Sequence, residues 1–431
     1  MRYIISFVLL FVIGLPAFSG CSKQATSVAA SDTTSAQNRT DRQVSRSDGN
    51  METKQTPASP EAQKLASGFN QFGFRLLQHS QTQEENVFVS PLSIATALSL
   101  AATGAKGLTR QQITDTLGEI GIQPSQSDKA NFELLSSLKS TDPNVQIDIA
   151  NSIWAQKNAH FKQDFLGRNQ QFFNAEIQSI DFGSPGAAAT INKWVDTKTH
   201  HKIDKIVKDL NPATMMMLLN AVYFKGQWQT PFEKDATSPD TFTSSGGSKA
   251  QVPMMNQSGK YLYRKGDHWQ SVALPYGSGR TNLYVFLPDE DSSLVKLISQ
   301  LNEQNWDQWL NGFTEKTGNI RLPKLKLEYE SDLVSLLSDL GIKDAFSPGK
   351  ADFSGMTDEV PLYIQKVKHK TYLEVDEEGT TAAAVTAIEM RAGSAMPAPP
   401  FNFIVNRPFL IAIRDSQTGS ILFIGSIVKV K

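Results

Sequence analysis

The chain of 431 residues has only one cysteine, Cys21, and six histidines. A single cysteine allows no disulfide within the chain and leaves the residues after it without a thiol for catalysis. The histidines are scattered, and the adjacent pair, His200 and His201, would point in different directions and make a poor metal pair. We therefore expect neither a metal nor a cofactor, and a fold that depends on packing alone.

Catalytic motifs and an excess of one charge are missing as well. The sequence contains no Gly-x-Ser-x-Gly, no His-Glu-x-x-His and no phosphate-binding glycine loop, which argues against an enzyme. The formal net charge is −1 and the pI is about 6.6, so no basic field points to nucleic acid. We expect a protein that is not an enzyme and has no nucleic-acid partner.

The N-terminal residues predict export. A positive start is followed by an uncharged apolar run at residues 4–16 and by Phe-Ser-Gly-Cys at residues 18–21. The run is shorter than the ~20 apolar residues of a transmembrane helix. The pattern resembles a bacterial lipoprotein signal, which implies a signal peptide over residues 1–20 and a lipid on Cys21 that anchors the protein to the membrane at the cell envelope or surface. An ordinary secretory signal on a secreted protein is the alternative.

Residues 21–62 follow as the cysteine and a linker. The linker is rich in Ser, Thr, Gln, Ala and Asp and has few large apolar residues, a composition typical of disorder. As a flexible coil of about 40 residues it would hold the next domain roughly 35 Å from its anchor. We therefore assign the folded domain to residues 63–431.

The folded region mixes helical and strand patterns. Apolar residues recur at helical spacing within residues 65–77, whereas residues 148–156 alternate with the period of a strand. Residues 215–224 form a nearly continuous apolar run that suits a strand buried on both faces. Residues 401–413 and 421–430 have the pattern of a hairpin. Because the two kinds of element are interleaved without regular βαβ spacing, we predict an α+β fold built on large sheets.

One segment, residues 374–394, fits two structures. After Gly379 the even-numbered positions 380–392 are all small or apolar, and Glu389 and Arg391 have the other parity. A strand alternates faces with period two, so the segment could insert into a sheet with its even side chains buried and both charges in water. Its alanine-rich composition suits a helix equally well. Composition alone leaves both structures open.

Eight short motifs, in the family's order, resemble the serpins and cover roughly residues 63–431. Each motif alone is weak, but the ordered set is specific. The motifs are Asn86-x-Phe88-x-Ser90-Pro91-x-Ser93; Gly104-Ala105-Lys106-Gly107-x-Thr109; Asn220-Ala221-Val222-Tyr223-Phe224-Lys225-Gly226-x-Trp228-x-x-Pro231-Phe232; Leu322-Pro323-Lys324; Asp352-Phe353-Ser354-Gly355; His369-Lys370; Glu377-Glu378-Gly379-Thr380; and Asn406-Arg407-Pro408-Phe409. The resemblance implies one α+β domain with three β-sheets, about nine helices and an exposed reactive-centre loop.

The resemblance also places a hinge in the ambiguous segment. It implies that the residues after the hinge are exposed, are cut by a protease and then insert as a strand, which agrees with the parity of the side chains. The hinge residues are Glu377, Glu378, Gly379, Thr380, Thr381, Ala382, Ala383 and Ala384.

Three peptide bonds are candidates for the bond that the protease cuts. The family's usual interval from Gly379 places it at Gly393-Ser394, where small residues suit elastase-like or subtilisin-like enzymes. Arg391-Ala392 suits trypsin-like enzymes, which select basic side chains with an acidic pocket. Met390-Arg391 is the third candidate.

Two further sites are carried over from the family. The shutter, a buried polar cluster beneath the central sheet, is matched by Ser90, Ser93, Asn151, Asn220 and His369. Such groups must satisfy one another's hydrogen bonds when they are buried together. The breach, where the hinge enters the sheet, is matched by Trp228. Without the resemblance these two rings would be interpreted as an isolated strand histidine and a core tryptophan.

The resemblance implies an irreversible suicide-substrate inhibitor of serine proteases, and also of cysteine proteases. Cleavage of the loop, trapping of the acyl-enzyme and insertion of the loop into the central sheet are the expected steps. The expected partner is a target serine protease in a covalent complex, and the protein itself is expected to be a monomer. A non-inhibitory serpin that binds or carries a ligand is the alternative. The hinge has no bulky, charged or proline residue after Gly379, which favours inhibition.

Overall fold

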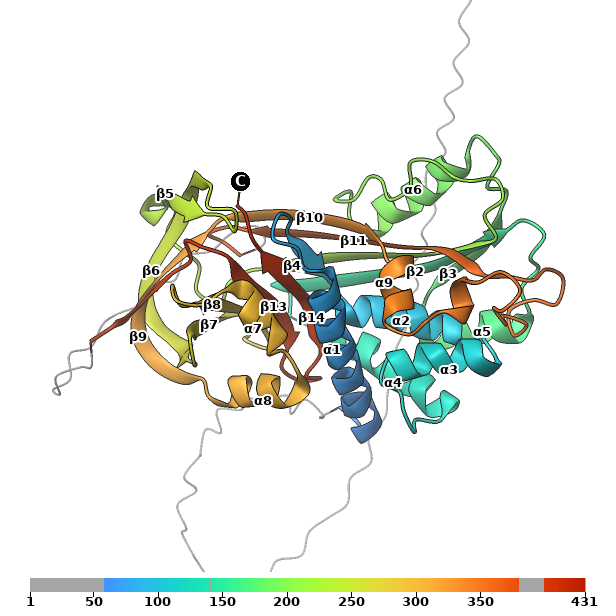
Figure 1. Cartoon of the computed structure of the whole chain (residues 1–431), viewed down its shortest axis with the longest axis horizontal. Helices are drawn as coiled ribbons and strands as arrows, with labels where there is room; N and C mark the ends of the chain where they lie inside the picture. Colours follow the sequence, from blue (N-terminus) through green and yellow to red (C-terminus); the bar gives the residue numbers. More distant parts are fainter. Residues whose placement is uncertain (1–57, 140–141, 380–398, 431) are drawn as a thin grey trace, which may run out of the picture. The chain divides into compact units, whose positions relative to one another are not determined.

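Two sheets form the frame of residues 58–139, 142–379 and 399–430, which are the residues described by the computed structural model (Figure 1). These residues belong to one unit, Thr56–Lys431. The predictions on residues 1–57, including Cys21, and on residues 380–398 lie outside the described part of the chain. Within the described residues, no helix has both the length and the apolar character needed to cross a membrane.

The smaller sheet has five strands in the order β10-β11-β4-β2-β3. Its central neighbours β4 and β11 run parallel, whereas β10 is antiparallel to β11 and β2 is antiparallel to β4. Ten of the eleven residues of β4 are buried, as its continuous apolar run predicts for a strand covered on both faces. The bounds are β10 (Leu325–Asp332), β11 (Ile364–Val375), β4 (Met216–Gly226), β2 (Val145–Gln156) and β3 (Glu176–Ile180).

The larger sheet has nine strands in the order β1-β14-β13-β8-β7-β6-β9-β12, with β5 paired to β6. The 17-residue strand β6 pairs with β5 and β9 along most of its length and with β7 at its end, so two of the three expected sheets share one strand and form a continuous ladder. The bounds are β1 (Val87–Val89), β5 (Ser238–Thr243), β6 (Lys249–Lys265), β7 (Trp269–Tyr276), β8 (Thr281–Pro288), β9 (Thr314–Pro323), β12 (Phe401–Ile404), β13 (Phe409–Asp415) and β14 (Ile421–Ile427).

Nine α-helices occur among the described residues, and they confirm the predicted α+β class. Helix α1 begins where Ser59 accepts a hydrogen bond from Ala62 N and Pro60 occupies a position that needs no amide hydrogen. The bounds are α1 (Pro60–Ser80), α2 (Pro91–Ala102), α3 (Gly107–Thr116), α4 (Pro124–Leu138), α5 (Gln163–Phe172), α6 (Ala187–Lys198), α7 (Leu294–Ser299), α8 (Glu303–Asn311) and α9 (Val334–Asp339).

Helix α2 lies between the two sheets. All twelve of its residues are buried, and it contacts β2 and β4 on one side and β14 on the other. A helix surrounded by protein has no solvent face, which explains why its sequence is apolar nearly all round. Its polar residues Ser93, Thr96 and Ser99 therefore need partners inside the protein.

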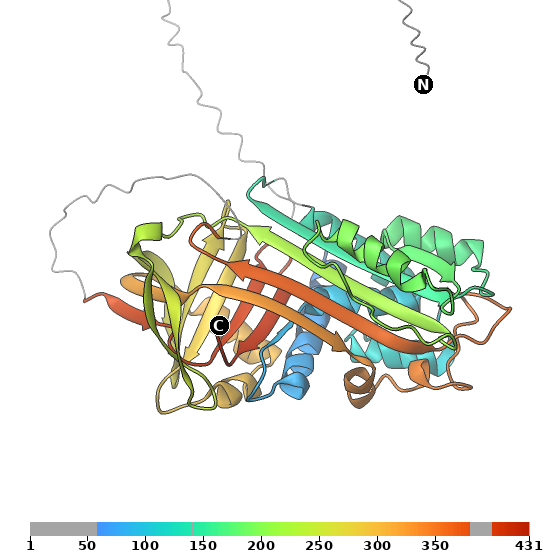
Figure 2. The same ribbon diagram turned by 90° about the horizontal axis from the view of Figure 1, so that it is seen from above.

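Helix α6 covers the opposite face of the five-stranded sheet (Figure 2). Ile191 and Val195 of α6 pack with Trp154 of β2, Leu219 of β4 and Tyr372 of β11 in a second apolar cluster, separate from the main core. Both faces of β4 are thus covered, whereas β11 alternates over most of its length between buried residues and more exposed ones.

Candidate functional site

The site is the seam between the parallel strands β4 and β11, with the turn that follows β11 at one end (Figure 2). Asn220 of β4 is the register partner of His369 of β11, and the two residues lie near the middle of the seam. In a parallel pair the hydrogen bonds are evenly spaced but slanted, and the pairing is slightly weaker per residue than antiparallel pairing. The seam is one of two parallel pairings in this sheet, and the other joins β2 to β3 at its edge.

The predicted shutter residues lie together on the α2 side of the seam. Asn220 Nδ2 donates to Asn151 Oδ1 at 2.6 Å and to the Ser93 carbonyl oxygen at 3.1 Å, and it also donates to the Ser93 hydroxyl. The Ser90 amide donates to His369 Nε2 at 3.2 Å, and His369 Nδ1 lies 2.6 Å from Asn220 Oδ1. One hydrogen-bonded cluster thus joins α2, β2, β4 and β11.

The hydrogen bonds of His369 fix its tautomer. The ring is fully buried, and burial lowers its pKa to about 3, so the imidazole is neutral. Since Nε2 accepts from the Ser90 amide, the single proton is on Nδ1 and is donated to Asn220 Oδ1. This N–H···O bond crosses the seam and must break if the two strands separate.

The predicted breach residue Trp228 lies just past the end of β4. Its ring stacks on Tyr276 with centroids 4.3 Å apart and planes 10° from parallel. Its indole Nε1 donates to the Asp376 carbonyl oxygen at 2.9 Å, and its amide donates to the Glu378 carbonyl oxygen at 3.0 Å. Trp228 therefore anchors the backbone of the hinge through two separate donors.

Two ion pairs anchor the acidic side chains of the hinge. Glu377 is only 5% exposed, and its carboxylate accepts from Lys324 Nζ and from Thr237 Oγ1, both at 2.7 Å. Burial by itself would raise the pKa of Glu377, but these hydrogen bonds outweigh burial and hold the pKa below its usual value. Glu378 forms an ion pair with the more exposed Lys234.

The hinge turns the chain back toward the seam at Gly379. Asp376 and Gly379 exchange both backbone hydrogen bonds, at 2.9 and 3.2 Å, which is the pattern of a two-residue antiparallel hairpin. Gly379 also forms an antiparallel bridge with Gln227, just beyond β4. Its φ is +112°, and a Cβ atom there would lie 2.3 Å from the Gly226 carbonyl oxygen and 2.5 Å from the Trp228 amide nitrogen. Only glycine fits this position.

The remaining predicted residues lie outside the described part of the chain. They are the hinge residues Thr380, Thr381, Ala382, Ala383 and Ala384 and the cleavage candidates Met390, Arg391, Ala392, Gly393 and Ser394.

The sequence profile described as Serpin (serine protease inhibitor) matches residues 67–430. The chain belongs to the serpin family. Iripin-2 of Ixodes ricinus is 37% identical over 86% of this chain and 94% of its own length. The native-state structure of Tengpin, a thermophilic serpin, superposes with a TM-score of 0.79 at 33% identity, over 85% of this chain and 94% of its own. The structure of human thyroxine-binding globulin in complex with thyroxine superposes with a TM-score of 0.79 at 27% identity, over 86% of this chain and 100% of its own.

Several residues that build this serpin's site were missed by the sequence interpretation. Thr96 accepts from Asn151 Nδ2 at 3.0 Å and extends the shutter cluster one turn along α2. Its signal was the spacing of three positions from Ser93 on an otherwise apolar helix. Lys324 lies within a recognised motif, but the motif assigned it no role. Thr237 and Lys234 have no local signal, because their partners Glu377 and Glu378 lie about 140 positions away.

A segment after α6 crosses the outer face of the seam and was also missed. His200 Nε2 lies 3.0 Å from the Asp148 carboxylate of β2. On the β11 side, Lys202 Nζ lies 5.5 Å from the centroid of the Tyr372 ring, and Lys370 Nζ donates to the Lys205 carbonyl oxygen at 2.8 Å. The segment thus contacts β2 on one side of the seam and β11 on the other.

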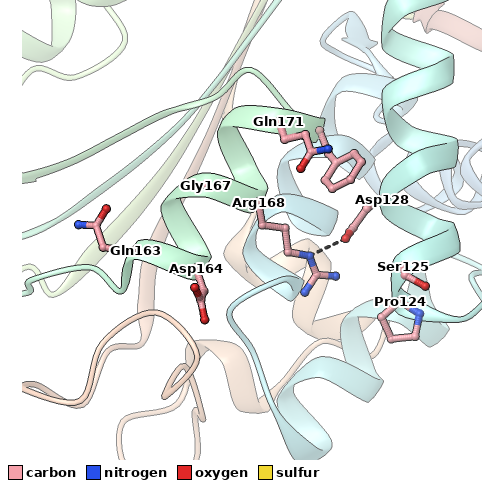
Figure 3. Close-up of a pocket in the computed structure, with 9 residues that line it drawn as sticks. Pro124, Ser125, Asp128, Gln163, Asp164, Gly167, Arg168 and Gln171 are labelled. Carbon is pink, nitrogen blue, oxygen red and sulfur yellow. Dashed lines mark hydrogen bonds and ion pairs between the residues drawn. The ribbon is translucent and has the colours of Figure 1, made fainter.

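A cleft between α4 and α5, of about 540 Å³, lies elsewhere in the domain (Figure 3). Arg168 of α5 points across it and forms an ion pair with the buried Asp128 of α4 at 2.5 Å. Asp164 and Gln163, also on α5, line the cleft. None of the predicted site residues lines it, so the cleft is separate from the seam.

Proposed function

We propose that this serpin is an irreversible suicide-substrate inhibitor of serine proteases, and that it also acts on cysteine proteases. The observation that carries the proposal is the parallel seam between β4 and β11, with a hairpin turn already formed at its end. A strand that continues from this turn and lies between β4 and β11 would run antiparallel to both. Each of its two edges could then form a complete hydrogen-bond ladder.

The residues after the turn have the side chains that such a strand needs. Even positions 380–388 are Thr, Ala, Ala, Thr and Ile, with no charge and no proline. The 14 steps from Gly379 to Gly393 would extend roughly 46 Å at ~3.3 Å per residue. That length approaches the breadth of a domain of about 370 residues, roughly 50–55 Å. Insertion would therefore carry an attached protease from one end of the sheet almost to the other.

The chemistry is that of an interrupted proteolysis. The protease serine oxygen attacks the carbonyl carbon of the reactive bond, the peptide C–N bond breaks, the new amine leaves, and an ester joins protease and inhibitor. Insertion of the freed loop then displaces and distorts the protease before water can hydrolyse the ester. The driving force is the hydrogen bonding and burial that the loop gains as a strand, in excess of the β4–β11 pairing that it replaces.

The reactive bond and the partners belong to the same proposal. Gly393-Ser394 and Arg391-Ala392 are equal candidates for the bond, with Met390-Arg391 as a third. The partner is a serine protease held covalently by a monomeric inhibitor. A lipid on Cys21 would hold the inhibitor at the membrane of the cell envelope or surface.

A carrier function is the alternative, since the similar thyroxine-binding globulin was solved with a bound hormone. Loop insertion distinguishes the two functions, because a carrier does not depend on it. The small, uncharged side chains at positions 380–384 support inhibition.

The proposal is tested by mixing the protein with trypsin, elastase and subtilisin. We expect a covalent complex that survives denaturing electrophoresis, and sequencing of the released C-terminal peptide identifies the bond. Thr380→Arg should convert inhibitor into substrate, because position 380 would have to bury the charge, whereas the matched control Thr381→Arg, on the other face, should still trap protease. Cleavage without any complex, together with unchanged thermal stability of the cut protein, would favour the carrier.

A further inference from the structure

The cleft between α4 and α5 has the size and the mixed lining of a small-molecule site. Its volume of about 540 Å³ lies within the range of such sites, roughly 300–1,000 Å³. On α5 the lining residues Asp164, Gly167 and Arg168 follow helical spacing and so share one face. Phe172, which also lines the cleft, contacts Phe132 of α4 edge to face with ring centroids 6.4 Å apart. One wall of the cleft is therefore aromatic.

Gly167 keeps the cleft open. It lies in the middle of α5, where glycine is less favourable than alanine because it gives up more backbone freedom. Its φ is outside the left-handed region, and a Cβ atom there would meet nothing within 4 Å. Neither backbone conformation nor packing therefore requires glycine at this position. The effect of the missing side chain is an unfilled space between the two helices.

Arg168 is held in place across the cleft by one side of its guanidinium group (Figure 3). Its Nε contacts Asp128 at 2.5 Å, and the Asp128 side chain is only 8% exposed. The two terminal nitrogens of Arg168 have no hydrogen-bond or ion-pair partner in the part of the chain that the structure describes. A guanidinium edge of this kind binds a carboxylate through two parallel N–H donors. Asp128 thus orients Arg168 and leaves that edge available.

Asp164 gives the cleft a free carboxylate beside this cation. It lies four positions before Arg168, a spacing at which opposite charges on a helix commonly pair and the Cβ atoms are about 5–6 Å apart. Arg168 pairs with Asp128 instead, and Asp164 has no ion pair or side-chain hydrogen bond within the described residues. The cleft therefore presents an unused cationic edge and an unused carboxylate within about one helical turn.

The charges around the cleft favour a zwitterion over a simple ion. Burial lowers the pKa of Arg110 on α3, and the nearby Arg168 lowers it further, whereas Asp128 raises it. Two cations, Arg110 and Arg168, thus lie near two acids, Asp128 and Asp164. An anion alone would face Asp164, and a cation alone would face Arg168 and Arg110. A ligand with one charge of each sign, close together, satisfies both free groups.

We propose that the cleft between α4 and α5 binds a free α-amino acid with an apolar side chain. The ligand carboxylate accepts from the terminal nitrogens of Arg168, and its ammonium group donates to Asp164. The apolar side chain lies against Phe172 and Pro124. The inference does not depend on the proposed function, since the cleft is separate from the seam.

Binding is tested on the full chain by saturation-transfer NMR with L-phenylalanine as the probe. We expect saturable binding with a Kd on the order of 1 mM, as befits a ligand of about 12 non-hydrogen atoms in an open cleft. 3-Phenylpropionate lacks the ammonium group and 2-phenylethylamine lacks the carboxylate, so each should bind severalfold more weakly. Equal binding of 3-phenylpropionate would indicate a site for anions and overturn the inference. No saturable binding of L-phenylalanine up to about 10 mM would overturn it as well.

Substitutions on α5 locate the bound amino acid. Gly167→Leu puts a side chain into the cleft and should abolish binding, whereas Gln170→Leu, at an exposed position outside the cleft, should leave it unchanged. Leucine favours a helix more than glycine does, and an unfolding midpoint that is not lowered confirms that the variant is folded. Asp164→Asn should weaken L-phenylalanine severalfold without weakening 3-phenylpropionate. Unchanged binding in Gly167→Leu would place the amino acid elsewhere and refute the cleft.

Discussion

Among single residues, Glu377 is the clearest case of a side chain that holds the hinge. Its buried carboxylate accepts from Lys324 and Thr237, each at 2.7 Å. Glu377→Gln keeps an acceptor for Thr237 but loses the charge that faces Lys324. We expect the uncut protein to lose about 2 kcal/mol of stability, measured as a lower midpoint of urea unfolding.

Glu378→Gln is the matched control for this substitution. Glu378 pairs with Lys234, whose side chain is 67% exposed, and such surface pairs contribute little. Its loss should lower the midpoint far less. Equal losses for the two variants would mean that burial of Glu377 is not what makes its ion pair important.

The shutter histidine predicts a dependence of stability on pH. Burial lowers the pKa of His369 to about 3 in the folded protein, against an ordinary value of 6.5. The folded state binds this proton less well than the unfolded state, so the stability due to neutral His369 is complete above pH 6.5 and falls as the pH drops toward 3. The loss is about 1.4 kcal/mol per pH unit.

Urea unfolding of His369→Gln at pH 7, 6, 5 and 4 checks this dependence. The stability of His369→Gln should fall much less between pH 7 and pH 4, whereas the stability of His268→Gln should fall as in the unsubstituted protein. Hydrogen bonding to Asp291 raises the pKa of His268, so its contribution has the opposite sign and is lost as the pH rises. A decline that persists unchanged in His369→Gln would assign it to other groups.

The residue scale also shows where sequence interpretation ends. Asn220 and His369 could be named from motifs, and the structure joins them at 2.6 Å. Lys234 and Thr237 could not be named, because an ion pair or hydrogen bond formed over about 140 positions leaves no local pattern in either segment. Burial decides which of such contacts matter, and burial is a property of the folded protein.

At the scale of elements, the turn before the loop depends on one glycine. Gly379 has a φ of +112°, and a Cβ atom there would lie 2.3 Å from the Gly226 carbonyl oxygen. Gly379→Ala must therefore push the turn away from β4, and we expect a lower unfolding midpoint of the uncut protein and slower trapping of protease. Stopped-flow inhibition kinetics and thermal unfolding measure the two effects.

Gly349→Ala separates backbone strain from the clash. Gly349 has a φ of +76°, and a Cβ atom there would meet nothing within 4 Å. This variant should show only a modest loss of stability and normal kinetics. Slow trapping in both variants would show that close contact with β4 is not the reason for glycine at position 379.

The elements differ in how far their sequences determine them. The apolar run at residues 215–224 predicted a doubly buried strand, and β4 is one. The pairing of β4 with β11 could not be predicted from periodicity, since nothing in either strand specifies a partner so distant. The sharing of β6 between two expected sheets was not predicted either. It depends on β7 pairing with only the last residues of the 17-residue strand β6, which no local pattern specifies.

At the scale of the whole molecule, we propose that Cys21 decides where the protein is held. A lipid on Cys21 would keep the domain at the membrane. Cys21→Ser should move the protein from the membrane fraction to the soluble exported fraction. An unchanged distribution, with no lipid detected by mass spectrometry of the N-terminal peptide, would contradict the anchor.

The distance along the chain between the two sides of the seam has a consequence for biosynthesis. Asn220 and His369 are 149 positions apart, whereas the segment after Gly379 is joined to β11 by a two-residue turn. If the segment after Gly379 can insert, as proposed, it would compete with β4 for the edge of β11 during folding, because closing the shorter loop loses less entropy. The order in which the two segments reach β11 would then decide whether the folded protein can still trap a protease.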